Sequence, residues 1–477
     1  MRPLILFVAA VTLAGAALRF STLGVQSYWA DEGVTVRLMR LSLHGMLSAI
    51  PNSESTPPLY YLLAWVWTKL FGTGEWGLRS LSALIGTATI PVAYLLGARL
   101  ASARAGAVAA ALAAFSPLLV WYSQEARSYA LVVLLTGLSL VLFAQRRVWW
   151  WAIVSILALA THYFALFAVV PCALWLLWRG GGRRAWAAVA AVALAGAALL
   201  PLAIDQASNH AADFIRVSSL GTRLLQVPKQ FLVGYDSPWE TAATVAAVLL
   251  AALALVLLVT RSTPRERRGA GAAAALGLAI ALPPVILAAL GADYLITRNV
   301  LVAWLPAAVV LAAGFAASRA RLLGTAGAAA LCALGLALVI AVESDSRYQR
   351  EDWRGVARAL GPATVPRAIV VSPLGGAAGI EAYMPHARVF PQAYLPVRQI
   401  DVAAVASRRA GHAALPPSLP HPVYAYFELA GSHVSRTYTV FRLLSVGRLA
   451  RLEHPVNLNL LRLYGRQATI LIETPHR

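Results

Sequence analysis

The chain contains little cysteine, lysine or acid. Its 477 residues include two cysteines, and 40 basic residues outnumber 20 acidic ones. Lys69 and Lys229 are the only lysines, so nearly all the basic residues are arginines. Cys172 and Cys332 both fall in apolar segments, so the sequence predicts neither a disulfide framework nor a cysteine metal cluster.

Charge of either sign is scarce. Only 13% of the residues are charged and 59% are hydrophobic, with a mean hydropathy of +0.68. A soluble domain has about 25% charged residues, so this composition predicts a polytopic α-helical membrane protein. The net charge of +20 does not indicate nucleic-acid binding, because many of the arginines lie in short loops between apolar runs rather than on one soluble face.

Eleven apolar runs approach the length of about 17–25 residues that crosses a bilayer. Groups of arginines fall in alternate loops, which predicts a cytoplasmic N-terminus and an extracytoplasmic C-terminus in the cytoplasmic membrane. The first run also fits a signal peptide, although Leu18, Arg19 and Phe20 form a poor cleavage site. The predicted spans are 4–20, 79–98, 105–121, 128–144, 148–163, 164–178, 185–204, 239–260, 270–290, 298–317 and 322–342.

The sequence predicts two domains. Residues 1–342 hold the spans, and residues 343–477, where charges and prolines appear, are expected to form a small external α/β domain. Within it we expect a helix at 353–360 and strands at 368–371, 423–427 and 437–441. In the first external loop, the aromatic run 59–67 after two prolines predicts a helix along the membrane surface, and 34–48 a second one.

Asp31 and Glu32 stand side by side directly after the first predicted span. Carboxylates are costly near hydrocarbon, so this placement suggests a function. The alternative is that the pair caps a helix beginning near Val34. The topology places further polar side chains on the same outer side: Glu54, Glu75, Arg79, Glu125, Arg127, His162, Asp293 and Arg298.

Several sequence blocks follow one another in residues 1–310. They are Trp29-Ala30-Asp31-Glu32, Thr56-Pro57-Pro58-Leu59-Tyr60-Tyr61 with Leu70-Phe71-Gly72, Glu75 and Leu78-Arg79, and Ser116-Pro117 with Ser123-Gln124-Glu125-Ala126-Arg127-Ser128-Tyr129, with weaker matches at Thr161-His162-Tyr163 and Arg298-Asn299. These blocks resemble family 39-type GT-C glycosyltransferases, which include protein O-mannosyltransferases and aminoarabinose transferases. The resemblance implies a GT-C fold, a polyprenyl-phosphate-linked sugar donor and inverting transfer outside the cytoplasmic membrane.

Inverting transfer needs a carboxylate that takes the proton from the acceptor hydroxyl. Asp31 is the expected base, as the resemblance also implies, and Glu32 would orient the acceptor or tune Asp31. Arg298 is a candidate for binding the donor phosphate, or an anchor at the membrane interface. Arg127 is a second phosphate candidate, or a partner for Glu125.

Three further candidates have structural alternatives. Glu125 would bind a divalent cation, orient Arg127 or be a structural partner. His162 is either a site residue or a satisfied polar residue at a helix end, and Tyr60 is either a donor contact or an interface anchor. Thr56 stands where some relatives carry Lys or His, which argues against the lipid A branch. There is no zinc-ligand spacing, and a single Mg²⁺ or Mn²⁺ on Asp31 and Glu125 is an open alternative.

The sequence thus predicts a membrane mannosyltransferase-like enzyme, with arabinose as the second choice of sugar. Its partners would be the lipid bilayer, the polyprenyl-phosphate sugar and a glycolipid, polysaccharide or protein acceptor, with no nucleic acid. A transporter or flippase of a lipid-linked sugar is the alternative, but the spans lack the central charges and repeats that such proteins use. A membrane scaffold acting through residues 343–477 would not explain the acids of the first loop.

Overall fold

The computed structural model describes residues 2–209, 213–373, 375–389, 394–405, 427–446, 450–453 and 468–475. The chain forms two compact units. The first contains Met1–Leu23 and Ser42–Ala341, and the second contains Gly24–Leu41 and Val342–Arg477. The segment that carries Asp31 and Glu32 therefore belongs to the unit formed by the C-terminal residues.

The first unit is helical. In the described part of the chain, seven helices are long and apolar enough to cross a membrane, one bent helix pair passes the same test, and three shorter apolar helices accompany them. Each of the eleven predicted spans coincides with one of these, which confirms the prediction of a polytopic helical membrane protein. The short fifth and sixth spans are two helices separated at His162.

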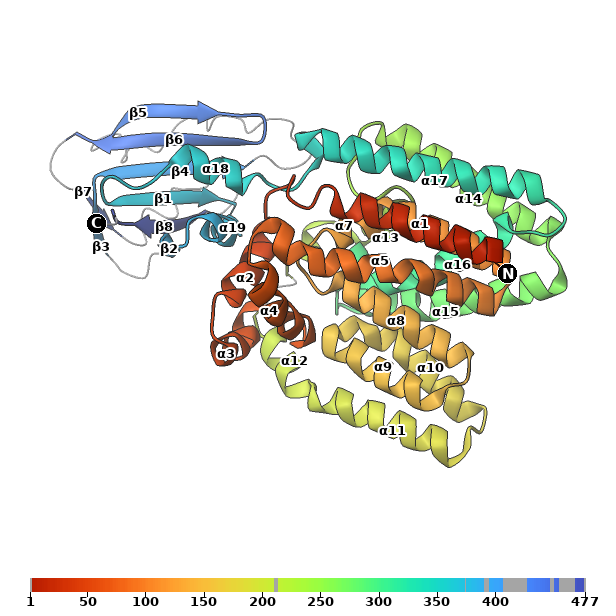
Figure 1. Ribbon diagram of the computed structural model, residues 1–477. Coiled ribbons are helices and arrows are strands. Elements are labelled where there is room, and N and C mark those ends of the chain that lie inside the picture. The colour runs from red at the N-terminus through yellow and green to blue at the C-terminus, as the bar shows by residue number, and fades with distance from the viewer. Residues whose placement is uncertain are drawn as a thin grey trace. The chain divides into compact units, whose positions relative to one another are not determined.

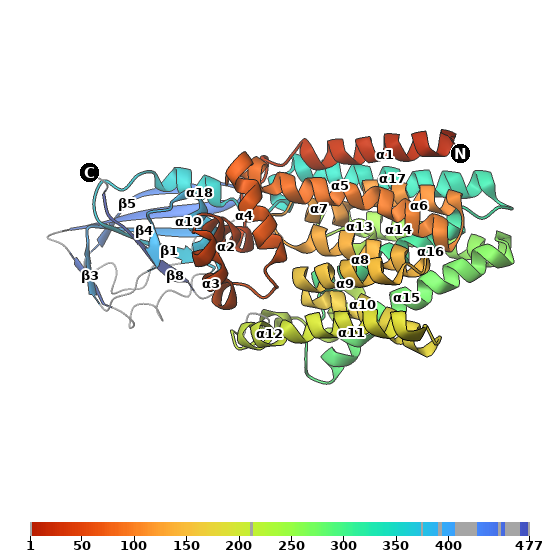
Figure 2. The same ribbon diagram turned by 60° about the horizontal axis from the view of Figure 1, so that its bottom comes forward.

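Figures 1 and 2 show how these helices run along a common direction. The helices of the first unit are α1 (Arg2–Phe20), α3 (Leu43–Ser53), α4 (Leu59–Phe71), α5 (Glu75–Leu100), α6 (Ala103–Phe115), α7 (Pro117–Ser123), α8 (Tyr129–Ala144), α9 (Val148–Thr161), η1 (Tyr163–Ala165), α10 (Leu166–Trp178), α11 (Gly182–Ala198), α12 (Leu200–Ala207), η2 (Asp213–Val217), α13 (Leu220–Val233), α14 (Glu240–Arg261), α15 (Pro264–Ala289), η3 (Thr297–Ala303), α16 (Trp304–Phe315) and α17 (Arg321–Ser344), the last three residues of which are assigned to the second unit.

One predicted span is broken. The segment expected as a single helix at 105–121 bends by 59° between α6 and α7. Pro117 has no N–H to donate and would clash inside a continuous helix, so a new helix starts there with Ser116 as its cap. Arg19 is fully buried and donates to the carbonyl oxygens of Ala113 and Ala114 at 2.9 and 3.0 Å. It therefore satisfies carbonyls at the end of α6.

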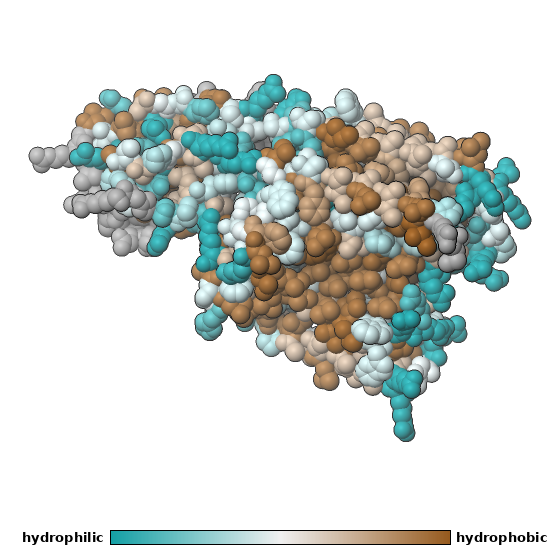
Figure 3. Space-filling model, viewed as in Figure 1, coloured by the Kyte–Doolittle hydropathy of each residue, from teal (hydrophilic) through white to brown (hydrophobic). Residues whose placement is uncertain are grey.

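The polar turns of this unit gather at one end. The turns that join α5 to α6, α10 to α11 and α16 to α17 lie at the same end as the N-terminus (Figures 1 and 2). Between the ends the surface is apolar: Figure 3 shows hydrophobic side chains over α8 and α9, and the exposed residues of α9 include Trp149, Trp150 and Ile153. An apolar belt between polar ends is what a bilayer requires.

The helix expected at 34–48 is instead two helices. The first is α2 (Ala30–Met39), in the second unit, and the other is α3 in the first unit. Helix α2 ends at Met39, and Ser42 caps the next helix by accepting a hydrogen bond from the Gly45 N–H at 3.1 Å. A local cap thus decided a boundary that the hydrophobic pattern did not reveal.

The second unit contains a mixed sheet with the strand order β2-β8-β1-β4-β6-β5. The strands β1 and β4 are parallel, whereas β8 runs antiparallel to β1, and β6 antiparallel to β4 and β5. A separate two-stranded sheet pairs β3 with β7. The elements are α2, η4 (Ser346–Tyr348), α18 (Trp353–Leu360), β1 (Arg367–Ser372), α19 (Gly376–Tyr383), β2 (Arg388–Val389), β3 (Tyr394–Val397), β4 (Gln399–Val405), β5 (Phe427–Val434), β6 (Tyr438–Ser445), β7 (Ala450–Glu453) and β8 (Thr469–Glu473).

Successive residues of β1 point to opposite faces of the six-stranded sheet. Ile369 and Val371 pack with Trp353 and Ile380 of α18 and α19, whereas Val370 belongs to a second apolar cluster. Both faces are thus covered, which explains the unbroken apolar run of this strand.

The elements predicted in the C-terminal part can be compared with these. The predicted helix at 353–360 is α18, the strand at 368–371 lies within β1, and 437–441 overlaps β6. The small external-domain prediction of an α/β fold is confirmed. Of the strand expected at 423–427 only Phe427 is described, as the first residue of β5, and residues 423–426 lie outside the described part.

Candidate active site

The Asp31–Glu32 pair lies in the first turn of α2, where acids are favoured by the N–H groups at a helix start. Glu32 accepts a hydrogen bond from the Trp29 N–H at 3.4 Å, so the capping role considered above is present in part. The Glu32 side chain is fully buried, and its Oε2 lies 4.0 Å from the Nε of Arg350.

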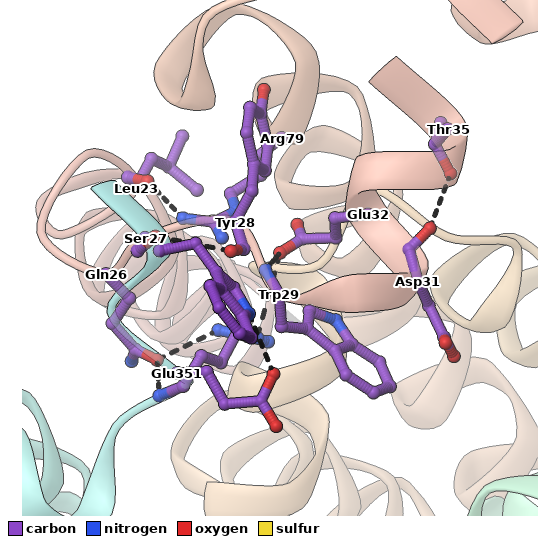
Figure 4. Close-up of polar contacts among 12 residues, drawn as sticks. Leu23, Gln26, Ser27, Tyr28, Trp29, Asp31, Glu32, Thr35, Arg79 and Glu351 are labelled. Carbon is purple, nitrogen blue, oxygen red and sulfur yellow. Dashed lines mark hydrogen bonds and ion pairs between the residues drawn. The ribbon is translucent and has the colours of Figure 1, made fainter. Parts of the chain in front are cut away.

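The two carboxylates point in different directions. Figure 4 shows Glu32 and Asp31 projecting to opposite sides of the start of α2. Asp31 is half-buried, whereas Glu32 is wholly enclosed. Of the two, Asp31 is therefore the more accessible carboxylate, and Glu32 is enclosed by the protein.

The Thr56–Tyr61 block forms a buried polar network in the first unit. Arg127 donates through Nη1 to Glu54 Oε1 at 2.8 Å, the same nitrogen lies 2.8 Å from Oε2, and both side chains are at most 8% exposed. The Tyr61 hydroxyl lies 3.2 Å from Thr56 Oγ1, and its ring centroid is 5.9 Å from the Arg127 guanidinium. Burial, opposed by the charge of Arg127 and reinforced by Glu54, raises the pKa of Tyr61 well above its ordinary value. Tyr61 is thus a neutral phenol and a hydrogen-bond donor.

The ionic partner of Arg127 was not predicted. The sequence suggested Glu125 as the alternative to a phosphate, and the structure shows the guanidinium paired with Glu54, 73 residues away. Glu125 itself is buried in the turn between α7 and α8, and its carbonyl accepts a hydrogen bond from the Arg127 N–H at 2.8 Å. Glu54 stands two residues before Thr56, at the edge of the same motif, and that proximity is the signal in the sequence that could have pointed to it.

Tyr60 and His162 are both buried and bonded within the helical unit. The Tyr60 hydroxyl lies 2.9 Å from Ser82 Oγ, which ties α4 to α5. His162 accepts a hydrogen bond at Nδ1 from the Phe164 N–H at 3.3 Å and packs against the ring of Tyr129. The contacts of His162 fit a satisfied polar residue at a helix end. Tyr60 is fully buried, so it joins two helices and is not an anchor at the membrane interface.

Arg298 is the second residue of the helical turn η3 and is half-buried. Its guanidinium carbon lies 5.3 Å from the ring centroid of Phe214. His162 lies within the electrostatic reach of both Arg298 and Arg127. The first unit therefore brings three of the candidate residues into one region, although they come from separate parts of the sequence.

A second ion pair stands beside this region and was not predicted. Arg223 of α13 forms a bidentate salt bridge with Asp293, with Nη1 2.6 Å from Oδ1 and Nη2 2.5 Å from Oδ2. Its Nη1 also donates to the carbonyl of Leu295. The Arg223 guanidinium holds the pKa of the Asp293 carboxyl below its ordinary value of 3.8. The pair fixes the segment that leads into Arg298.

A metal site is not indicated among the described residues. There, no three histidine, cysteine, aspartate or glutamate side chains come together in a way that would hold an ion. A Mg²⁺ or Mn²⁺ on Asp31 and Glu125 stays a prediction, and these two residues belong to different units.

Comparison with known proteins supplies the family context. Residues 55–205 match the family described as dolichyl-phosphate-mannose-protein mannosyltransferase. That range contains Tyr60, Glu125, Arg127 and His162, and it excludes Asp31. No curated protein matches the chain.

Solved structures match over most of the length. ArnT from Cupriavidus metallidurans in the apo state shares 14% identity and a TM-score of 0.57, with 92% of this chain and 97% of that chain covered. ArnT bound to undecaprenyl phosphate gives a TM-score of 0.54 at the same coverage and identity. The Archaeoglobus fulgidus oligosaccharyltransferase in the apo form gives 0.51 at 14% identity, with 80% of this chain and 63% of that chain covered.

The chain has the GT-C fold. The expected fold is confirmed, and the family match in residues 55–205 adds support for glycosyl transfer. In this GT-C protein the sequence-predicted site residues divide between the two units: Asp31 and Glu32 lie in the second, and the tyrosine, histidine and arginine candidates lie in the first.

Proposed function

We propose that this GT-C protein is an inverting glycosyltransferase that moves a sugar from a polyprenyl-phosphate donor to an acceptor hydroxyl at the outer face of the cytoplasmic membrane. The observation that carries the proposal is the match of residues 55–205 to the mannosyltransferase family within a chain of GT-C fold. Mannose is the first choice of sugar and arabinose the second. The acceptor hydroxyl belongs to a glycolipid, a polysaccharide or a protein.

Asp31 is the general base in this scheme. Its carboxylate takes the proton of the acceptor hydroxyl while that oxygen attacks the anomeric carbon. The bond between the anomeric carbon and the phosphate oxygen breaks, and the polyprenyl phosphate leaves with the electron pair. Attack from the face opposite the phosphate inverts the anomeric configuration. The half-burial of Asp31 beside a fully buried Glu32 supports this division of roles.

Arg298 is our choice for the group that binds the donor phosphate. A guanidinium offers paired donors to phosphate oxygens. Arg127 already forms an ion pair with Glu54, so much of its charge is neutralised where it lies. Arg127 and His162 then complete the polar surroundings of the donor, with the Tyr61 phenol as a further hydrogen-bond donor.

The polyprenyl chain needs an apolar groove, and the helical unit offers one. A cavity of about 460 Å³ is bounded by α6, α7, α13, α14, α15, α16 and α17. Its walls are almost entirely apolar, as for a hydrocarbon ligand, and include Ala274, Leu278, Trp304 and Cys332. ArnT from Cupriavidus metallidurans binds undecaprenyl phosphate, and a chain of that chemical class suits such a cavity.

The outer-face location rests on the arrangement of arginines. The turns at the N-terminal end of the helical unit carry them, which favours a cytoplasmic position for that end. Those arginines are Arg99, Arg104, Arg179, Arg183, Arg184, Arg319 and Arg321.

The test is turnover of undecaprenyl-phosphate-mannose by the full-length protein, with native membranes as the source of acceptors. We expect Asp31→Asn to lower turnover by about 10²–10⁴-fold, because it removes the base and keeps the side-chain size. The variant should be made and inserted like the wild type. Near-normal turnover by Asp31→Asn would show that another group is the base. Movement of intact donor across the bilayer without a glycosylated product would favour the flippase alternative.

A further inference from the structure

The segment before α2, residues 24–29, is hydrogen-bonded to the C-terminal part of the second unit. The Tyr28 N–H donates to the Tyr383 hydroxyl at 2.7 Å. The Arg354 guanidinium donates to the carbonyl of Gly24 at 3.0 Å, and the Arg354 N–H donates to Ser27 Oγ at 3.0 Å. These bonds fix the backbone on the N-terminal side of Asp31.

Helix α2 itself packs against α19 at backbone distance. A Cβ atom at Gly33 would lie 2.1 Å from the carbonyl oxygen of Ala378 and 2.8 Å from the Gly379 nitrogen. Helix α19 rests in turn on Trp353 of α18, since a Cβ at Gly379 would lie 2.4 Å from that indole. At the far end of α2, Arg40 donates to two carbonyls at the end of α19.

A buried charge pair lies at the start of α2. The side chains of Glu32 and Arg350 are 0% and 1% exposed, and the Glu32 Oε2 is 4.0 Å from the Arg350 Nε. Both the Arg350 N–H and its Nη1 donate to the Gln26 side-chain oxygen at 3.1 Å. Gln26 donates onward to Glu343 at 3.0 Å. The carboxylate next to Asp31 is therefore held by an arginine of the C-terminal part.

We propose that the C-terminal part of the second unit holds the catalytic carboxylate of Asp31 in position. In this proposal Arg350 is a positioning residue for Asp31 that acts through Glu32. This inference rests on the proposed function. Asp31 and Glu32 are consecutive residues of one helical turn, so a shift of one moves the other (Figure 4). Arg350 supplies a positive charge beside the buried Glu32, so its removal raises the cost of keeping that carboxylate in place and favours a shift of the turn.

A first experiment tests whether α2 packs on α19, and it needs no assay of activity. Hydrogen exchange is measured on the full-length protein in detergent, comparing Gly33→Ala with Gly24→Ala. At Gly33 an added methyl group meets the backbone of α19, whereas at Gly24 nothing lies within 4 Å. We expect faster exchange in residues 27–41 for Gly33→Ala and wild-type exchange for Gly24→Ala. Unchanged exchange in Gly33→Ala would overturn the docking of α2 on α19.

A second experiment tests the positioning role. Turnover of undecaprenyl-phosphate-mannose is compared for Arg350→Gln, Arg350→Lys and the control Arg347→Gln. Arg347 is a neighbouring arginine that is 51% exposed and pairs with Asp345 at 2.6 Å. We expect Arg350→Gln to lower kcat by about 10²-fold with the donor KM unchanged, since misplacing a reacting group by about 1 Å costs this much. Arg350→Lys should recover part of the loss, and Arg347→Gln should equal the wild type.

The outcomes separate the two proposals. Wild-type kcat in Arg350→Gln, together with an inactive Asp31→Asn, would overturn the positioning role and leave the proposed function standing. A loss that appears as a raised donor KM would also overturn it, because it would place Arg350 in donor binding. No turnover of this donor by the wild type would count against the proposed donor. The exchange experiment would still decide whether α2 packs on the C-terminal part of the second unit.

Discussion

At the scale of single residues, two ion pairs of the first unit join distant segments. Arg127 with Glu54 and Arg223 with Asp293 are separated by 73 and 70 residues. Removing one member of such a pair leaves a buried charge, which costs far more than the pair contributes. The Arg298 guanidinium carbon lies 5.3 Å from the Phe214 ring centroid. Two predictions at this scale concern Arg298 and the pair of Arg223 with Asp293.

Arg298→Gln should raise the donor KM by about 10–100-fold, the worth of a charge-assisted hydrogen bond of about 1.5–3 kcal/mol. Arg298→Lys should fall between, because an ammonium keeps the charge without the paired geometry. Arg216→Gln is the control, since Arg216 is an exposed neighbour that donates to the carbonyl of Gly291. Initial rates over a range of undecaprenyl-phosphate-mannose concentrations measure the effect. An unchanged KM for Arg298→Gln would remove this arginine from the phosphate site.

Asp293→Asn should lower the free energy of unfolding by about 3–5 kcal/mol at neutral pH, because it leaves Arg223 buried without its counter-charge. The pKa of Asp293 is lowered in the folded protein, so its contribution is full above the ordinary value of 3.8 and is lost as pH falls through the lowered value. The gap in melting temperature between wild type and variant should therefore be wide at pH 7 and close at strongly acidic pH. Asp205→Asn, at an exposed carboxyl, should show no such gap at either pH.

At the scale of elements, two local features place the polar candidate residues: the bend between α6 and α7, and the close contact of α2 with α19. The bend between α6 and α7 carries the chain from a regular span into the turn of Glu125 and Arg127, and Arg19 binds the carbonyls at the end of α6. Gly33 lets α2 approach α19 closely. The bend thus places polar residues at the end of an apolar span, and the short contact fixes the helix whose first turn carries Asp31 and Glu32.

Helix α15 offers a matched pair of substitutions for the proposed lipid groove. Ala274 lines the cavity, and its neighbour Ala275 is exposed on the same helix and is not among the lining residues. Ala274→Phe should raise the KM for a long-chain polyprenyl donor about tenfold, a loss of about 1.4 kcal/mol of binding, with kcat little changed. Ala275→Phe should behave like the wild type. Equal KM values for the two variants would show that the donor chain lies elsewhere.

At the scale of the whole molecule, the chain passes between its two units three times, at residues 23–24, 41–42 and 341–342. A fragment that begins at residue 343 would lack α2, which covers part of α19. The domain that looks separate in the sequence is therefore completed by a segment from the first loop.

The orientation in the membrane gives a prediction for the intact protein. In spheroplasts, a membrane-impermeant thiol reagent should label Arg436→Cys in the turn between β5 and β6, and should label Arg321→Cys only after permeabilisation. Both positions are exposed, and the native Cys172 is buried while Cys332 is half-buried in the helical unit. The reverse labelling pattern would invert the proposed topology. The wild-type protein, which has only the two native cysteines, gives the background labelling.

Local sequence patterns predicted most of the apolar helices and the class of fold. The apolar runs became helices because burying each run in a bilayer depends on the residues of that run alone. The helix Trp353–Leu360 was predicted to the residue, since Asp352 caps its start and Gly361, at a positive φ of 60°, ends it. The blocks around Asp31 and Tyr60 likewise pointed to the class of fold through local sequence alone.

The sequence by itself determined the membrane character and the apolar helices of the described residues, and it offered the two adjacent acids as candidate site residues. Only the tertiary structure decided that Glu54 pairs with Arg127, that Arg223 pairs with Asp293, and that α2 belongs with the C-terminal domain. The reason is physical. Hydrophobicity and helix caps act within a few residues, whereas the partner of a buried charge is set by which distant segments pack together.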